Sequence, residues 1–386
     1  MPTRIATGLA VEETGPQGFA AAADEALAGL DGAPADLAVV FAGATHVQHA
    51  VEGLAEVGER LGPAALIGCG AQGVLAGGQE VEAGGVAVWA ASMPGAEVET
   101  FSLEAVTALE GGTAVAGMPD LDGADAAILL VDPYSFPAEA LLSSVGEEHP
   151  GLPLIGGLAS SGGGPGNAVL MHDGAILSQG AVGVALAGVD VRPCVSQGAR
   201  PLGPEMVITA GHGNVIHELA SRPALSRLKE AIAELSIEER MLAAQGLLLG
   251  IVIDENQPEY ERGDFLVRGL LSVDEETGSL TVGERVRVGQ TVRMHVRDEA
   301  SAHEDLHHAL GRQLEGLSAP PAGALMFTCN GRGSHMFSTP HHDASEVEGV
   351  LGGRPVAGFF CAGEIGPVGP RSFLHGFTAT LAVFAG

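Results

Sequence analysis

Apolar residues recur in two alternating patterns along this chain. Continuous apolar runs at residues 37–41 and 85–91 have the length of buried strands. Between them, residues 46–60 place apolar side chains at the three- and four-residue spacing of one helix face. Strands that are apolar on both faces and alternate with helices predict an α/β fold with buried sheets.

This order of elements occurs three times. Strand, helix, glycine loop and strand follow one another over residues 37–91, 126–186 and 324–384. The three glycine loops align without a gap as Gly-x-x-x-x-Gly at residues 68–73, 157–162 and 358–363. In that alignment Cys361 and Glu364 give the last copy both a thiol and a carboxylate. The last copy is therefore the one we expect to have a specific role.

The segment between the second and third copies is less regular. It predicts one long helix over residues 224–245, strands at 246–253 and 265–274 that suggest a degenerate fourth unit, and two strands over 282–296 joined at a turn. A further helix over residues 302–317 has Ser301 as a plausible N-cap.

Proline and glycine cluster at residues 200–204 and mark a boundary. It divides the chain into predicted domains at residues 1–200 and 201–386. We predict an α/β fold of two pseudo-repeated halves, made of strand–helix–strand–strand units whose mixed, largely buried sheets are flanked by helices.

Charge and composition limit the kinds of partner that the protein is expected to bind. The formal net charge is −30, and Lys229 is the single lysine. This composition argues against nucleic acid and against anionic membrane surfaces, since both need clustered cations. The four cysteines are too scattered for a disulfide scaffold, no signal peptide is apparent, and the apolar runs are too short to span a bilayer. We expect an acidic cytoplasmic protein without membrane insertion.

Six polar residues lie at strand ends beside the third glycine loop, and we take them as candidate ligand-binding residues: Asn330, Arg332, Cys361, Glu364, Arg371 and His375. Ligands of open α/β sheets bind at the carboxyl ends of the strands. Glu364 and Arg371 would suit a small zwitterion, with the carboxylate on its ammonium and the guanidinium on its carboxylate. Alternatively these two residues pair with each other, and Arg332 stabilises a turn.

Other chemistries fit less well. No glycine loop carries the lysine of a phosphate-binding loop, and the loop at residues 68–73 does not open a helix as a dinucleotide site would. A metal site could be built from His335, His341, His342 and Asp343, but a helix start with Asp343 as N-cap and surface histidines explains them better. We therefore predict no metal site and no cofactor.

Covalent catalysis is the main alternative to ligand binding. Cys361 with His375 or His335 would be a nucleophile and base, with loop amides holding an oxyanion. The same cysteine is better explained as a small buried residue at a strand end.

Two segments of the third copy resemble the FIST family of sensory domains. They are Phe-Thr-Cys-Asn-Gly-Arg-Gly at residues 327–333 and the glycine-rich segment at 355–369, followed by Phe-Leu-His-Gly-Phe at 373–377. The resemblance extends over residues 35–380. The first loop departs from the family pattern, because Val74 stands where the family has a glutamate.

The resemblance implies a sensory module that binds a small ligand such as an amino acid. We expect a stand-alone intracellular sensor of a small polar ligand for signal transduction, with its output in an unknown downstream signalling protein, rather than an enzyme. The alternative is a cysteine-dependent hydrolase or transferase of small amides. A structural module without a pocket is a third possibility.

Overall fold

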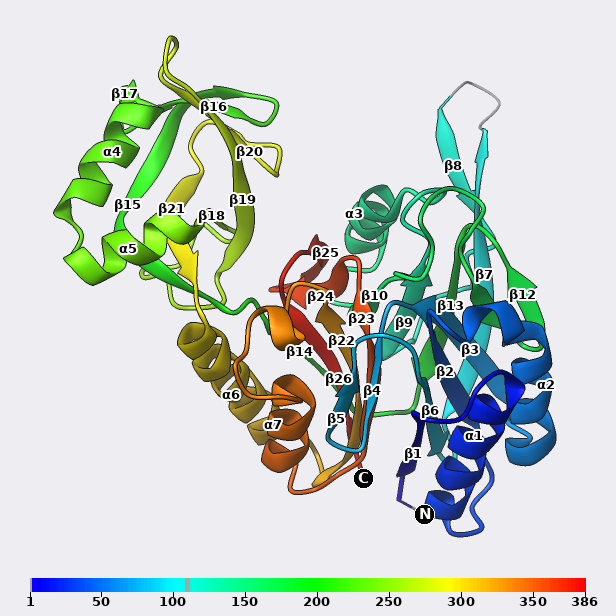
Figure 1. The fold of residues 1–386 in the computed structure, drawn as a ribbon. Coiled ribbons are helices and arrows are strands. Elements are labelled where there is room, and N and C mark those ends of the chain that lie inside the picture. Colours follow the sequence, from blue (N-terminus) through cyan, green and yellow to red (C-terminus); the bar gives the residue numbers. More distant parts are fainter. Residues whose placement is uncertain (1, 108–111) are drawn as a thin grey trace. The chain divides into compact units, whose positions relative to one another are not determined.

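The computed structural model describes residues 2–107 and 112–386 and divides into two compact units (Figure 1). The larger unit consists of Met1–Val195 and His307–Gly386, and the smaller one of Ser196–Leu306. The larger unit thus combines both ends of the chain. The division at residues 1–200 and 201–386 follows the chain instead, and it stays a prediction.

Three copies of one motif build the larger unit. In each copy two parallel strands are joined by a helix, and a third strand lies antiparallel beside the first. The first copy contains β2 (Leu37–Gly43), α2 (Ala50–Leu61), β3 (Ala65–Ala71) and β6 (Val86–Ser92). The second contains β9 (Ala126–Val131), α3 (Ala138–Glu148), β10 (Leu154–Leu158) and β13 (Ala181–Ala187). The third contains β22 (Pro321–Cys329), α7 (His342–Val350), β23 (Val356–Cys361) and β26 (Ala379–Ala385). The predicted mixed α/β fold class is confirmed.

Each copy also contributes a hairpin that pairs with the sheet of another copy. The hairpin of β4 (Val74–Ala76) and β5 (Gln79–Val81) pairs with β23 of the third copy. The hairpin of β11 (Leu170–His172) and β12 (Ala175–Leu177) pairs with β3 of the first copy. The hairpin of β24 (Glu364–Val368) and β25 (Arg371–His375) pairs with β10 of the second copy. The exchange is cyclic, so no copy completes its own sheet.

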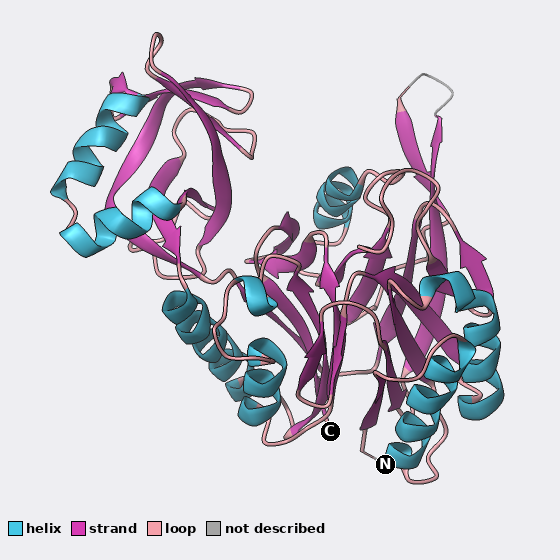
Figure 2. Cartoon of the chain, in the orientation of Figure 1, coloured by secondary structure: helices cyan, strands magenta, loops and turns pink. Residues whose placement is uncertain are grey.

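Further strands extend the three sheets at their other edges. These are β1 (Arg4–Ala10) beside β6, the ribbon of β7 (Glu97–Thr107) and β8 (Thr113–Ala116) beside β13, and β14 (Val191–Ser196) beside β26. The helix α1 (Pro16–Leu30) packs with α2 over the first sheet, as Figure 2 shows. None of the described helices is both long and apolar enough to cross a membrane.

Burial on both faces explains the continuous apolar strands. In β2, Leu37, Val39 and Phe41 enter a core that all three sheets share, whereas Ala38 and Val40 face the helices. At the shared core the Phe41 ring stacks on Phe359 with centroids 5.0 Å apart. Alternate side chains of one strand thus pack into two different cores, one on each face of the sheet. This arrangement requires apolar residues at every position of the strand.

The smaller unit is a closed antiparallel sheet. Its pairing order is β15 (Ala199–His212), β21 (Thr291–Arg297), β18 (Leu247–Val252), β19 (Phe265–Asp274), β20 (Ser279–Val282) and β16 (Val215–Leu219), with β17 (Arg222–Pro223) on β16. An additional pairing of β15 with β16 closes the ring. Two helices, α4 (Ala224–Glu234) and α5 (Ile237–Gln245), complete this unit. Because β18 and β19 are antiparallel neighbours, they do not form a fourth copy of the motif.

Three predictions for this segment are wrong in detail. The helix over residues 224–245 is broken at Leu235, where Ser236 forms a capping box with Glu239 and starts a second helix. The hairpin at residues 282–296 does not form, because β20 and β21 pair with other strands. The helix α6 (Glu299–Glu315) begins earlier than predicted, and its cap is Asp298, whose Oδ1 accepts the Ser301 N–H at 2.7 Å.

Candidate functional site

The three glycine loops meet inside the larger unit. Gly73 of the first loop accepts the Phe360 N–H at 3.0 Å. Ser160 of the second loop donates its hydroxyl to the Phe360 carbonyl at 2.5 Å and accepts the Gln72 N–H at 2.8 Å. The second and third loops also exchange main-chain hydrogen bonds, from Ala362 N–H to the Leu158 carbonyl at 3.0 Å. The hairpin exchange therefore brings the repeated loops together.

Glycine is required where these loops pack. A Cβ on Gly358 would lie 1.7 Å from the Met326 carbonyl oxygen on the adjacent strand. A Cβ on Gly157 would lie 2.4 Å from the Cys361 sulfur. Part of the glycine pattern is thus explained by close packing of neighbouring copies.

Glu364 is buried where the third loop ends. Its side chain is 0% exposed, and burial raises the pKa of its carboxyl to about 7. One oxygen, Oε2, accepts the Thr378 N–H at 3.0 Å and the Thr378 hydroxyl at 2.8 Å. The other, Oε1, has no hydrogen-bond partner among the described residues. The Cys329 thiol also interacts with this carboxylate, but a thiol is a weak donor.

The turn after β22 contains Asn330, which follows Cys329 and adjoins the third glycine loop. The Asn330 N–H donates to the Cys361 carbonyl at 3.0 Å, and the preceding Cys329 contacts Glu364. The buried side-chain oxygen of Asn330, Oδ1, likewise has no hydrogen-bond partner in the described part of the chain. The turns that follow β22 and β23 are thus neighbours, and each contains or directly precedes a buried acceptor without a donor among the described residues.

Arg332 is fully buried and binds a carboxylate. Its Nε and Nη2 donate to the two oxygens of Asp343 at 2.6 and 2.8 Å, and the Thr328 hydroxyl donates to the same carboxylate at 2.9 Å. Burial alone would raise the pKa of Asp343, but the Arg332 guanidinium holds it well below its usual range. The prediction of Asp343 as N-cap is wrong, because His341 occupies the cap and Asp343 lies in the first turn of α7.

The hairpin from the first copy adds a second buried acid. Glu80 of β5 is 6% exposed, and its Oε1 accepts the Ala344 N–H at 2.9 Å. Burial and the neighbouring Asp343 raise the pKa of Glu80 to about 7. The sequence pattern does not single out Glu80, because only the exchanged hairpin brings it to the third copy and no local pattern indicates that exchange.

Cys361 is buried among neighbouring copies. Its side chain is 0% exposed, and burial raises the pKa of its thiol well above the usual value. A buried thiol that resists ionisation is typical of a structural cysteine rather than a nucleophile. Cys329, which is partly exposed, has a pKa raised by burial to about 12.

The structure separates Arg371 from Glu364. In the β24–β25 hairpin Glu364 is opposite His375, whereas Arg371 is opposite Val368 at the other end. Four residues along a strand correspond to about 13 Å. The Arg371 side chain is exposed and lies against Gly146 of α3. His375 is buried next to Glu364, and its Nε2 hydrogen-bonds to the Gly366 carbonyl at 2.9 Å.

An exposed aromatic ring lies over the Asn330 turn. Phe377 has φ 63° and is 49% exposed, and a Cβ on Gly331 would lie 2.7 Å from its ring. A left-handed backbone is strained for a phenylalanine, and such strain is common at functional sites. Phe377 ends the segment at 373–377 that follows the glycine-rich segment, but nothing in the sequence pattern distinguished it.

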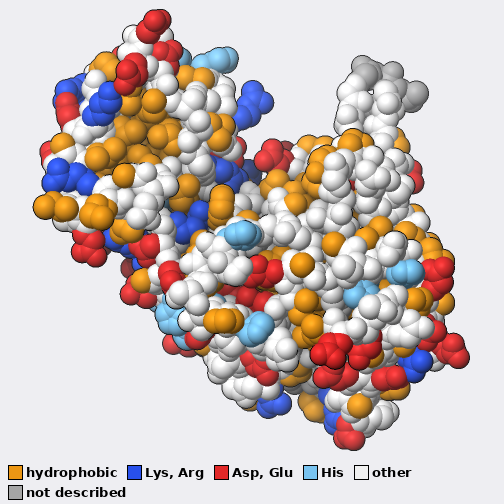
Figure 3. Space-filling model, in the orientation of Figure 1, with side chains coloured by type: hydrophobic (Ala, Val, Ile, Leu, Met, Phe, Trp, Pro, Cys, Tyr) orange, Lys and Arg blue, Asp and Glu red, His pale blue; other side chains and the backbone are white. Residues whose placement is uncertain are grey.

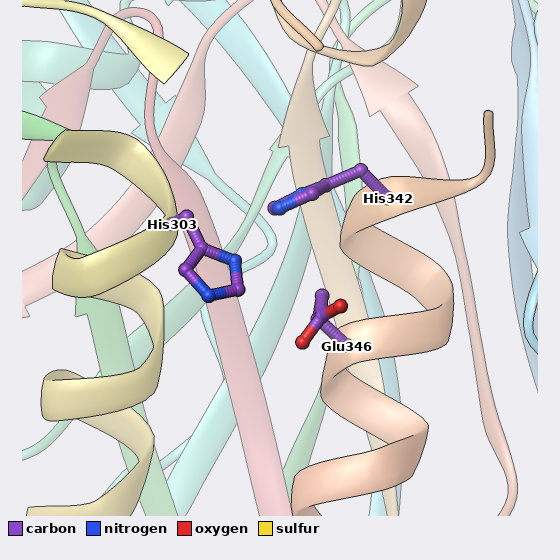
Figure 4. A group of neighbouring side chains, drawn as sticks. All are labelled: His303, His342 and Glu346. Atoms are coloured by element: carbon purple, nitrogen blue, oxygen red, sulfur yellow. The ribbon is translucent and has the colours of Figure 1, made fainter. Parts of the chain in front are cut away.

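The histidines of α7 and its approach have separate roles. His335 is exposed on a short 3-10 helix, η2 (Gly333–His335), and His341 Nδ1 accepts the Glu80 N–H at 2.9 Å. The His342 ring stacks on Phe337 with centroids 3.6 Å apart. His342 and Glu346 lie one turn apart on the same side of α7, as Figure 4 shows.

Comparison with known proteins finds two domain families along the chain. Residues 36–222 match the FIST N domain, and residues 224–367 match the FIST C domain. The chain is 44% identical over 382 residues to Uncharacterized protein Rv0628c of Mycobacterium tuberculosis, covering 99% of each chain. It is 42% identical over 382 residues to Uncharacterized protein Mb0898c of Mycobacterium bovis, covering 99% of this chain and 98% of the other.

Proposed function

The chain belongs to the FIST family, and we propose that it is a sensory protein that binds a small polar ligand at the carboxyl ends of β22 and β23. FIST domains are sensory domains. The finer proposal is an amino acid or related metabolite as ligand, a cytoplasmic protein, and a separate downstream signalling protein that receives the output.

One observation carries this proposal. Glu364 Oε1 and Asn330 Oδ1 are buried acceptors without hydrogen-bond partners among the described residues. Leaving a buried polar group unsatisfied costs about 1–3 kcal/mol, so donors on a ligand would recover free energy here. Cys361, His375 and the Arg332–Asp343 pair form the surroundings of these acceptors. Arg371, at the far end of its hairpin, is outside the site that we propose.

Thermal shifts with a panel of amino acids and related metabolites test the proposal. A ligand at a hundred times its dissociation constant should stabilise the protein by about 2.7 kcal/mol. Glu364→Gln should reduce that shift, because it replaces a carboxylate acceptor with an amide of similar shape. Arg371→Gln is the matched control on the same hairpin and should leave the shift intact. Absence of any shift across the panel, or an equal shift in Glu364→Gln, would contradict the proposal.

A further inference from the structure

We infer that the ligand of this site is a cation with N–H donors, an ammonium or guanidinium compound, whose carboxylate, where it has one, is not bound by the site. This inference rests on the proposed function and narrows it. It replaces the two-ended recognition of a zwitterion by recognition of its positive end alone.

Hydrogen-bond capacity is the first argument. The two buried side-chain oxygens that we assign to the site, Glu364 Oε1 and Asn330 Oδ1, are hydrogen-bond acceptors and do not donate. The nearby donors of Thr378 are already directed to Glu364 Oε2. A ligand carboxylate would bring further acceptor oxygens next to these two oxygens and be repelled by them. An ammonium or guanidinium group instead offers the N–H donors that the two oxygens lack.

Charge balance is the second argument. Three carboxylates of this region are buried in the described structure, namely those of Glu80, Asp343 and Glu364. The buried guanidinium of Arg332 is bound in a two-pronged pair to Asp343. The His342 ring also hydrogen-bonds to Asp343, through Nδ1 to Oδ1 at 3.1 Å. A buried carboxylate must either bind a proton or lie next to a cation. A cationic ligand would supply the positive charge next to the Glu364 carboxylate.

The aromatic ring and the surface charge fit the same ligand class. The exposed Phe377 ring lies over the Gly331 turn, and its backbone N–H interacts with the Cys329 sulfur next to Glu364. Ring faces attract ammonium and guanidinium groups. Acidic side chains are spread over the face of the larger unit that Figure 3 shows, with few Lys and Arg among them. Such a surface raises the local concentration of cations.

The arginines of the region do not offer a carboxylate clamp. Arg332 is 0% exposed and directs its Nε and Nη2 to Asp343. Arg371 lies about 13 Å along the hairpin from Glu364, given the register of β24 and β25. A ligand that reached both Glu364 and Arg371 would have to span that length of strand.

Matched probe pairs test the inference. Amino-acid amides keep the ammonium and lose the carboxylate, whereas N-acetyl amino acids keep the carboxylate and lose the ammonium. We expect the full-length protein to bind at least one amide more tightly than its N-acetyl partner, by about tenfold or more in dissociation constant. Tighter binding of the N-acetyl partners, or equal binding of both, would overturn the inference and leave the proposed function standing. Binding of no probe in either series would contradict both.

The pH dependence supplies a second readout. Methylguanidinium stays cationic between pH 6 and 8, so its binding reports on the protein. The groups that face Glu364 are the thiols of Cys329 and Cys361, the Arg332 guanidinium and His375. Burial raises the pKa of Glu364 to about 7. Ionisation should therefore tighten methylguanidinium binding by about tenfold from pH 6 to pH 8.

Variants separate this effect from a structural one. Glu364→Gln should weaken methylguanidinium binding at pH 8 and remove its pH dependence, while Arg371→Gln should preserve both. A pH dependence that persists unchanged in Glu364→Gln would overturn the role of this carboxylate.

Discussion

At the residue scale, packing alone does not explain the position of Glu364. It is fully buried, half of its hydrogen-bonding capacity is unused in the described structure, and burial raises its pKa to about 7. The sequence singled out Glu364 because the other two glycine loops have no carboxylate at the equivalent position. Its burial and its unpaired oxygen depend on the contacts of Thr378 and Cys329, which local patterns do not contain.

Replacing Glu364 should change how stability depends on pH. The folded-state pKa lies above the ordinary value of 4.5, so the folded protein retains a proton up to about pH 7. Its contribution to stability is fully present below pH 4.5 and is lost as pH rises through 7. Glu364→Gln cannot ionise, so its free energy of unfolding should fall less than that of the wild type between pH 5 and 8. The difference is on the order of 3 kcal/mol.

Urea unfolding at the two pH values measures this difference. Glu80→Gln is the matched comparison, since burial and Asp343 raise the pKa of Glu80 to about 7 as well. Equal pH slopes in the wild type and in Glu364→Gln would show that Glu364 is already ionised in the folded protein.

At the element scale, the glycine loops have an architectural role. Gly358 packs its Cα against the Met326 main chain of the adjacent strand. The hairpin that follows each loop leaves its own copy, so the loop is where the chain crosses to a neighbouring sheet. Glycine at these positions reflects close approach of backbones rather than contact with a ligand.

Gly358→Ala should therefore destabilise the protein strongly. Its new methyl group would meet main-chain atoms that cannot move away without breaking the pairing of β22 with β23. We expect a loss of at least about 2 kcal/mol in the free energy of unfolding. Gly349→Ala is the control within the same copy: it lies in α7 with nothing near the added Cβ, and should stabilise by up to about 1 kcal/mol. Similar effects of the two changes on the denaturation midpoint would refute this packing argument.

At the scale of the whole molecule, the cyclic hairpin exchange makes the larger unit one interlocked body. Residues of all three sheets contribute to one shared core. The final segment of the chain, which follows the smaller unit in sequence, belongs to this core again. Copies that complete each other's sheets should not unfold one at a time.

Core substitutions in different copies should lower the same thermal transition. Ile67→Ala, Ile128→Ala and Leu325→Ala each truncate a fully buried side chain, in the first, second and third copy respectively. Each should cost about 2–5 kcal/mol. Val51→Ala, at a position that is 67% exposed, should cost little. Differential scanning calorimetry measures the transitions, and a separate transition that moves with one copy alone would contradict the interlocked arrangement.

The sequence by itself determined the repeat, the buried strands with their helices, and the candidate residues around Glu364. These features follow from apolar runs and glycine spacing, which report burial and close approach along short stretches of chain. Only the tertiary structure decided which hairpin joins which sheet, that Glu80 reaches the third copy, and that Arg371 lies far from Glu364. Strand partners distant in sequence are chosen by the packing of the whole unit, and the register of a hairpin sets which side chains meet. The same limit applies to the proposed binding site. Whether a buried side-chain oxygen has a hydrogen-bond donor depends on residues that are distant in sequence and close in space.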